Sequence, residues 1–177
     1  MHNPGEFTLA GYGGEFPGGR MYITAVWGSL SDDSASLVAE LEQDALLPYL
    51  ERIEILDGGA MTDAGLTSIG TIRNLRRLRI EDAPQVTDDG VQELLNSLSH
   101  LESLELTLEQ CTDAAVDVNR GFPKMTHIDV SFTHLTDSGL LTLIAKAPRL
   151  ESLDVTGTLV TALGASRARQ PNLVIIM

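Results

Sequence analysis

The side chains best suited to chemistry in this sequence are a histidine and two aspartates in its second half, His127, Asp129 and Asp154. Imidazole and carboxylate groups are ligands of divalent metal ions. His127 and Asp129 stand two residues apart, so on a strand they share a face, with about 6.6–7 Å between their backbone positions. No other residue completes a closed ligand set. A divalent-metal or small-ligand site at this corner is therefore one hypothesis, and the sequence predicts no cofactor.

Catalysis has less support. Ser103, Ser131 and Ser152 have no recognisable base arrangement beside them, and the chain contains no nucleophile-elbow motif. We therefore predict a protein that is not an enzyme. An enzyme with an unrecognised site is the weakest alternative.

These residues belong to a chain that repeats itself. A Thr-Asp phrase preceded by an apolar residue recurs with 25, 25, 24 and 25 residues between successive threonines. The copies are Met61-Thr62-Asp63, Val86-Thr87-Asp88, Cys111-Thr112-Asp113, Leu135-Thr136-Asp137 and Val160-Thr161-Ala162, the last without its aspartate. An L-x-x-L-x-L pattern precedes each copy, starting at Leu50, Leu75, Leu101, Met125 and Leu150, with a truncated copy at Leu173-x-x-Ile176. Cys111 shares the apolar position of this phrase, which favours a core side chain over a reactive thiol.

Each repeat must contain one strand and one helix. The alternating apolar residues of the first pattern predict a short strand with its leucines inward and the intervening residues outward. The Thr-Asp phrase opens a helix, and residues 136–147 place Leu140, Leu143, Ile144 and Ala147 on one helical face. One unit cannot bury its apolar face alone, but stacked units can. We predict an α/β fold, a right-handed solenoid with a concave parallel β-sheet and helices on its convex side.

The Thr-Asp phrase itself is predicted to be structural. Thr62 suits a helix N-cap, whose side chain accepts a backbone N–H of the first turn. Asp63 follows at the positive end of the helix dipole. Met61 before the cap and Leu66 after it can form a hydrophobic staple. The same staple recurs in the pairs Val86 with Val91, Cys111 with Val116 and Leu135 with Leu140.

The repeat resembles that of leucine-rich repeat proteins of the cysteine-containing subfamily, and more closely that of their bacterial relatives with a TDAGL phrase, which stands here at residues 62–66. The F-box leucine-rich repeat proteins share this subfamily's repeat. The resemblance covers about residues 50–177 and implies the solenoid fold and a generic binding platform. No F-box pattern precedes the repeats, so a ubiquitin-ligase role is not implied. The turn after the strand lacks the cysteines that name the subfamily and holds Gly58, Ala83, Glu109, Thr133 and Thr158.

The domain organisation follows from the repeat. Residues 50–177 contain about five repeats and end in a terminal strand, "NLVIIM". Residues 21–49 form a degenerate N-terminal capping unit, with a strand over 21–27. Residues 1–20 are rich in glycine and are expected to be a flexible arm or a loop laid over the first unit. The edge of the last strand could remain unpaired or could pair in a homodimer.

The outward strand positions are the predicted partner-binding surface, because there the repeats differ from one another. In neighbouring strands about 4.8 Å apart, such positions form ladders across the sheet. The arginines cluster toward the N-terminal end, and Glu105, Asp129 and Asp154 form an acidic row toward the C-terminal end. The predicted partner-binding residues are Arg52, Glu54, Arg77, Arg79, Glu81, Ser103, Glu105, Thr107, His127, Asp129, Ser131, Ser152, Asp154 and Thr156.

Charge and composition narrow the kinds of partner. The 177 residues carry 25 acidic and 12 basic side chains, a net charge of −13, which disfavours nucleic acid and anionic membranes. The arginines of "IRNLRRLRI" (72–80) are expected to form salt bridges with Glu54, Glu81 and Glu105. A single cysteine permits no internal disulfide and fits the cytoplasm or another reducing intracellular compartment.

The sequence thus predicts a non-catalytic protein-interaction or scaffold module. Its concave face would bind a protein partner that presents a basic patch, and the module could be an accessory subunit of a larger assembly. The divalent-metal or small-ligand site at His127, Asp129 and Asp154 is the alternative function.

Overall fold

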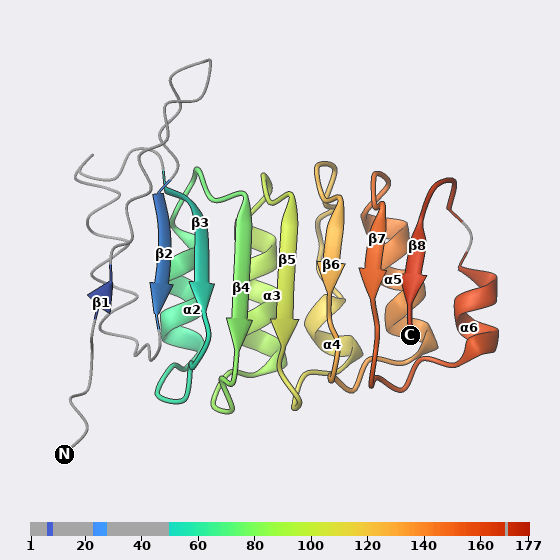
Figure 1. The fold of residues 1–177 in the computed structure, drawn as a ribbon, viewed down its shortest axis with the longest axis horizontal. Helices are drawn as coiled ribbons and strands as arrows, with labels where there is room; N and C mark the ends of the chain where they lie inside the picture. The colour runs from blue at the N-terminus through green and yellow to red at the C-terminus, as the bar shows by residue number, and fades with distance from the viewer. Residues whose placement is uncertain (1–6, 9–22, 28–49, 169) are drawn as a thin grey trace.

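The structure is a computed structural model that describes residues 7–8, 23–27, 50–168 and 170–177 (Figure 1). Strands and helices alternate along most of this part of the chain. Their bounds are β1 Phe7–Thr8, β2 Ile23–Trp27, β3 Leu50–Ile55, α2 Asp63–Gly70, β4 Arg77–Glu81, α3 Asp88–Ser97, β5 Ser103–Thr107, α4 Asp113–Val116, β6 His127–Asp129, α5 Asp137–Lys146, β7 Ser152–Asp154, α6 Ala162–Arg167 and β8 Val174–Ile176.

The described strands form one sheet whose spatial order is the order of the sequence, β1 to β8. β1 runs antiparallel to β2, and every later pair is parallel. The described helices all cover one face of this sheet, and the crossovers from β3 to β8 through them are right-handed (Figure 1). The predicted α/β solenoid is confirmed. We call the five strand-helix pairs from β3–α2 to β7–α6 the first to fifth units, and the sheet face opposite the helices the concave face.

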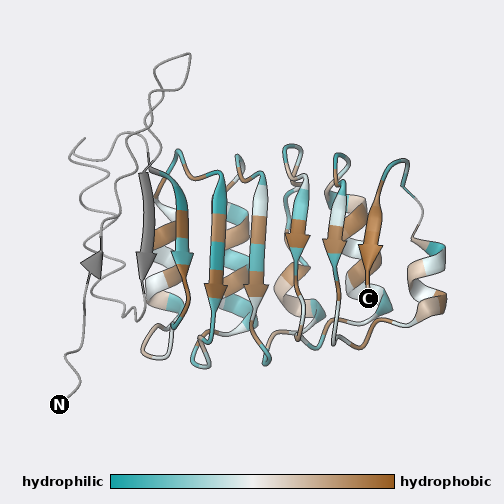
Figure 2. Ribbon diagram, in the orientation of Figure 1, coloured by the Kyte–Doolittle hydropathy of each residue, from teal (hydrophilic) through white to brown (hydrophobic). Residues whose placement is uncertain are grey.

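The core lies between the sheet and the helices, and the strand pattern explains it. Inward strand residues such as Ile53, Ile55, Leu78 and Ile80 are at most 2% exposed. Both members of each predicted staple pair are buried in the same cluster. Figure 2 shows the matching alternation of hydrophobic and hydrophilic residues along β3 to β5. Aliphatic burial of this kind is the main stabilising contribution in such a fold.

Threonine caps the helices as predicted, with one exception. The Thr62 hydroxyl accepts the N–H of Ala64 at 3.3 Å, and Thr112, Thr136 and Thr161 cap in the same manner. Thr87 precedes α3 in extended backbone but accepts no such bond.

The aspartate of each phrase does more than interact with its own helix dipole. Asp63 Oδ1 accepts the backbone N–H of Thr87 at 2.8 Å, and its Oδ2 accepts the Thr87 hydroxyl at 2.7 Å. We call this pair of bonds the Asp–Thr clamp, because it joins one unit to the next. It recurs from Asp88 to Thr112 (2.8 and 2.6 Å), from Asp113 to Thr136 (2.8 and 2.5 Å) and from Asp137 to Thr161 (2.7 and 2.8 Å).

Glycine in the first helical turn makes room for the clamp. A Cβ added at Gly139 would overlap the Asp113 carboxylate, and one at Gly164 would overlap that of Asp137. The third unit has Ala115 at the equivalent place, so the clamp also forms beside a methyl group there.

The helix of the third unit, α4, is only four residues long. The residues after it, "DVNRGFPK", combine poor helix formers with a glycine and a proline, which explains why the helix stops. Neighbouring helices satisfy the backbone groups that are left. Gln92 of α3 donates to the carbonyls of Ala114 (3.3 Å) and Asp117 (2.6 Å), and Lys146 of α5 donates to that of Val118.

At the N-terminal end, β2 lies within the strand predicted over residues 21–27, and Phe7 and Thr8 form β1 beside it. The predicted arm (1–20) and capping unit (21–49) otherwise lie outside the described residues.

At the other end, β8 forms with a register one residue away from the truncated repeat in the sequence. Ile175, not Ile176, pairs with Leu153. Asn172 takes a left-handed conformation (φ 67°) in the preceding turn. Since a shift of one residue exchanges the two faces of a strand, Ile176 points outward.

Candidate functional site

The outward ladders of the concave face form in the predicted register. Arg52, Arg77, Ser103, His127 and Ser152 are paired across β3 to β7, and so are Glu54, Arg79, Glu105, Asp129 and Asp154. Glu81 pairs with Thr107 in the third ladder. The structure therefore brings the predicted charged residues together on one face.

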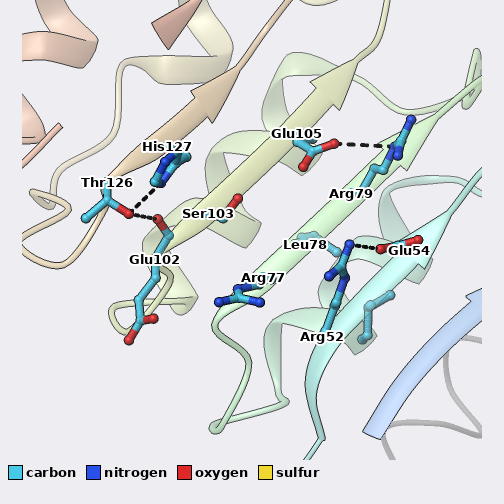
Figure 3. A pocket seen from close by; sticks show the side chains of 11 residues that line it. Arg52, Glu54, Arg77, Leu78, Arg79, Glu102, Ser103, Glu105, Thr126 and His127 are labelled. Carbon is cyan, nitrogen blue, oxygen red and sulfur yellow. Dashed lines mark hydrogen bonds and ion pairs between the residues drawn. The ribbon is translucent and has the colours of Figure 1, made fainter. Parts of the chain in front are cut away.

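Most charges at the N-terminal end neutralise one another. The predicted salt bridges from residues 72–80 form to Glu81 and Glu105, whereas Glu54 pairs with Arg52, outside that stretch. Arg52 forms an ion pair with Glu54, and Arg79 Nε lies 3.4 Å from Glu105 Oε2 (Figure 3). Arg79 Nη2 also lies 2.5 Å from Glu81 Oε1. The hydrogen bond to Glu81, followed by the charges of Glu81, Glu105 and Glu54, raises the pKa of Arg79, against an opposing effect of burial.

Arg76, the residue before β4, forms ion pairs with Glu51 in β3 and with Glu102, the residue before β5. Arg76 Nη1 lies 2.5 Å from Glu102 Oε1, and Arg76 Nε lies 3.5 Å from Glu51 Oε1. The hydrogen bond to Glu102 is the main cause of the raised pKa of Arg76. Arg76 and Glu102 thus compensate each other before β4 and β5 begin.

Arg77 differs from these arginines. Its side chain is exposed, and it forms no ion pair with any residue that the structure describes. It lies in a hollow of about 300 Å³ on the concave face, which we call the arginine hollow. The hollow is lined by Arg52, Glu54, Arg77, Arg79, Glu102, Ser103, Glu105, Thr126 and His127, together with Ile53 and Leu78 (Figure 3).

Glu105, Asp129 and Asp154 lie side by side across β5 to β7 as a row, but Glu105 also forms an ion pair with Arg79. Asp129 and Asp154 remain, side by side on β6 and β7 and without a cationic partner among the described residues. Each carboxylate is fixed by one backbone bond at 2.8 Å, from the N–H of Ser131 to Asp129 Oδ1 and from that of Thr156 to Asp154 Oδ1. Their second carboxylate oxygens carry no described hydrogen bond.

One predicted partner-binding residue is misplaced. Ser131 is only 6% exposed, so its side chain does not belong to the open concave face. β6 ends at Asp129, and Val130, Ser131 and Thr133 after it are all buried.

The geometry gives no support to a metal site. Within the part of the chain that the structure describes, no group of three or more His, Cys, Asp or Glu side chains could hold a metal ion. His127 Nδ1 lies 2.8 Å from the Thr126 hydroxyl, while Asp129 and Asp154 bind backbone N–H groups. Cys111 is buried, as predicted, and burial followed by the charges of Asp88 and Asp63 raises the pKa of its thiol to about 12. No described helix is long and apolar enough to cross a membrane.

Sequence reasoning missed two apolar residues on the concave face. Val174 pairs with Ser152 and Ile176 pairs with Asp154, so both extend the ladders into β8. They are 60% and 44% exposed, and Figure 2 shows β8 as hydrophobic along its length. The repeat pattern in "NLVIIM" places Ile176 opposite Leu153, whereas in the structure Ile175 takes that place. This shift by one residue hid the outward position of Val174 and Ile176.

Phe132, after β6, was also missed. It is 60% exposed and has a left-handed backbone conformation (φ 59°), which is uncommon for an aromatic residue. Its ring lies against Gly157, where a Cβ would come within 2.7 Å of Phe132 Cδ1. An exposed aromatic held in a strained conformation near the acidic pair is a candidate contact residue. The signal was an aromatic residue at the place where other units have Asp82 and Gly157.

Comparison with known proteins agrees with this architecture. A family model described as "Leucine Rich repeat" matches residues 123–143, which span β6 and most of α5. A chain in the crystal structure of the Rad7 and Elc1 complex of yeast is similar in structure, with a TM-score of 0.64 at 23% sequence identity. The match covers 83% of the present chain and 37% of that chain. No curated protein matches. The fold and the matched repeat together support a leucine-rich repeat protein.

Proposed function

We propose that this protein is a non-catalytic protein-interaction module that binds a protein partner through its concave face. The core, the caps and the clamps repeat from unit to unit, whereas the outward strand residues do not. This difference supports a surface adapted to a particular partner on a generic frame. The similar yeast chain comes from a complex of two proteins, which agrees with a role as an accessory or scaffold subunit.

The observation that carries the proposal is the pair Asp129 and Asp154. Their carboxylates stand side by side, held in place by the backbone, and no described residue supplies a cation beside them. Two adjacent like charges repel each other, so a basic group of a partner would relieve that repulsion. Phe132, three residues after Asp129, adds an exposed apolar ring. The proposed partner therefore presents a basic patch, and neither nucleic acid nor a membrane is expected.

The residue pattern also supports two narrower assignments. The Thr-Asp phrase with its glycine favours the bacterial TDAGL-type repeats of the cysteine-containing subfamily. One buried cysteine and a net charge of −13 agree with the cytoplasm or another reducing intracellular compartment.

Affinity capture from the native host, with identification of the captured proteins, tests the proposal. The informative variant is Asp129→Asn with Asp154→Asn, because asparagine keeps the oxygen that accepts the backbone N–H while removing the charge. We expect the captured partner to be lost or strongly reduced, and binding by the unchanged protein to weaken as salt rises.

The matched control is Asp89→Asn with Asp117→Asn, which removes two exposed negative charges from the helix side. Capture by this control should equal that of the unchanged protein. Equal capture by both double variants would show that the acidic pair is not the interface and would refute the proposal.

A further inference from the structure

The charges of the arginine hollow do not balance locally. Arg52 and Arg79 are occupied by Glu54, Glu81 and Glu105, and Glu102 is occupied by Arg76. Arg77 is left as an exposed guanidinium without an ion pair among the described residues. Beside it on β5, Ser103 has a hydroxyl with no described hydrogen bond. This half of the concave face therefore offers donors, whereas Asp129 and Asp154 offer acceptors.

We propose that the concave face binds an extended protein segment carrying one carboxylate side chain for Arg77 and one basic side chain for Asp129 and Asp154. This inference rests on the proposed function and specifies the partner segment. The guanidinium can donate two parallel hydrogen bonds to a carboxylate. Ser103 can donate a further bond from the neighbouring strand.

A carboxylate fits the hollow better than a phosphate group. Glu54, Glu102 and Glu105 also line the hollow, and the chain carries a net charge of −13. One free guanidinium balances a group with one negative charge. A phosphate group with close to two negative charges would be repelled by the surrounding carboxylates.

The spacing of the two subsites defines the segment. Asp129 lies two strands from Arg77 and Asp154 lies three, each one same-face step further along its strand. With strands about 4.8 Å apart and same-face steps of about 6.6 Å, the separations are about 12 Å to Asp129 and about 16 Å to Asp154. Two same-face residues of an extended peptide that stand four positions apart are about 13 Å apart. The segment should therefore contain an acidic and a basic residue four positions apart.

A synthetic peptide, acetyl-Thr-Glu-Thr-Val-Thr-Arg-Thr-amide, supplies this spacing in residues that favour an extended backbone. Binding to the full chain is measured by ¹⁵N NMR titration, which follows the backbone amide of Ser103 and the Nε–H of Arg77. We expect salt-sensitive shifts at these groups and at Asp129 and Asp154. Arg77→Gln should weaken binding by about fivefold. Arg73→Gln removes an exposed arginine outside the hollow and should change nothing.

A peptide with Gln in place of Glu isolates the carboxylate. It should bind about fivefold more weakly to the unchanged protein, and Arg77→Gln should weaken it no further, because the paired groups are coupled. A peptide with phosphoserine in place of Glu should bind no more tightly. The inference would be overturned if the Glu peptide did not bind, or if the Gln peptide bound as tightly as the Glu peptide. It would also be overturned if the phosphopeptide bound more tightly in a manner that depends on Arg77.

The captured partner separates this inference from the proposed function. If Arg77→Gln leaves capture intact while the Asp129 and Asp154 double variant abolishes it, the carboxylate subsite is wrong and the interaction module stands. If the double variant also leaves capture intact, the proposed function itself fails.

Discussion

Asp113 shows, at the scale of single residues, how the Thr-Asp phrase holds the fold together. Its half-buried carboxylate accepts both the N–H and the hydroxyl of Thr136 in the next unit. Asp113→Ala leaves these two donors without their charged partner, so we expect a loss of about 2 kcal/mol in the free energy of unfolding. Urea denaturation followed by circular dichroism measures it.

Asp89→Ala is the matched control for this clamp. Asp89 is exposed in the first turn of α3, where it interacts with a helix dipole but joins no other unit in the described structure. Its replacement should cost at most about 0.5 kcal/mol. Equal losses in the two variants would mean that the clamp adds nothing beyond helix-dipole interactions.

Asp137 makes the clamp sensitive to acid. The backbone and hydroxyl hydrogen bonds from Thr161 lower the pKa of Asp137 below its ordinary value of 3.8, against an opposing effect of burial, and the charge of Arg167 contributes least. A carboxyl group whose pKa is lowered by folding stabilises the protein fully above its unfolded pKa, and this stabilisation disappears as the pH falls through the folded pKa.

We therefore expect Asp137→Asn to be less stable than the unchanged protein above about pH 5, and the difference to shrink below about pH 4. Urea denaturation at a series of pH values measures it. A stability difference that stays constant across this range would contradict the role of the ionised carboxylate.

Cys111 reports on the integrity of the core. Its thiol is buried with a pKa raised to about 12, so at pH 8 only about one molecule in ten thousand carries the reactive thiolate. We expect Ellman's reagent to react slowly with the native protein and rapidly once urea unfolds it. Rapid reaction under native conditions, at a rate close to that in urea, would show that the third unit is open.

At the scale of elements, the sequence predicted the strands and helices because their patterns are local. Alternation specified which residues of β3 to β7 face the core, and the Thr-Asp phrase specified where each helix begins. The Asp–Thr clamps were not predicted, since they join residues 23 or 24 positions apart whose spacing is visible only when the units are stacked.

The candidate site likewise has features that the sequence could predict and features that it could not. Membership of the ladders could be predicted, because register follows from the repeat. The sequence could not predict which charges remain without an ion pair. Arg79 can reach Glu81 on its own strand or Glu105 on the next, and it contacts both. The outward place of Ile176 depended on one residue in the turn before β8, and a turn of that kind leaves no periodic signal.

α4 is the element whose stability depends most on its neighbours. Gln92→Ala removes the two hydrogen bonds that α3 donates to carbonyls of Ala114 and Asp117. We expect the free energy of unfolding to fall by about 1 kcal/mol. Hydrogen exchange over residues 113–118 should become faster than in the unchanged protein, while exchange in the rest of the chain stays the same. Glu93→Ala, an exposed change on the same helix, should do neither. Uniformly faster exchange over the whole chain would contradict a local role for Gln92.

At the scale of the whole molecule, the solenoid should respond to damage according to distance along the stack. Each unit contacts mainly its neighbours, so stability is approximately a sum of local contributions. Asp63→Ala and Asp137→Ala affect separate pairs of units, and their costs should add within about 0.5 kcal/mol. Asp88→Ala and Asp113→Ala both release the third unit and should deviate from additivity.

Urea denaturation of the two double variants and the four single variants provides the measurement. Equal deviation for the distant and the adjacent pair would indicate a molecule that unfolds as one indivisible block.

The Asp–Thr clamp also determines how such a protein can change its length. The second, third and fourth units each carry both halves of the junction: a threonine that donates to the unit before it, and an aspartate one position later that accepts from the unit after it. Duplicating or deleting a whole internal unit would again place an aspartate opposite a threonine of the next unit. Changing the length by a fraction of a unit would leave an aspartate without that threonine. Thr161 donates to Asp137 of the fourth unit, but Ala162 has no carboxylate for a following unit. Extending the array beyond the fifth unit would therefore require a different junction.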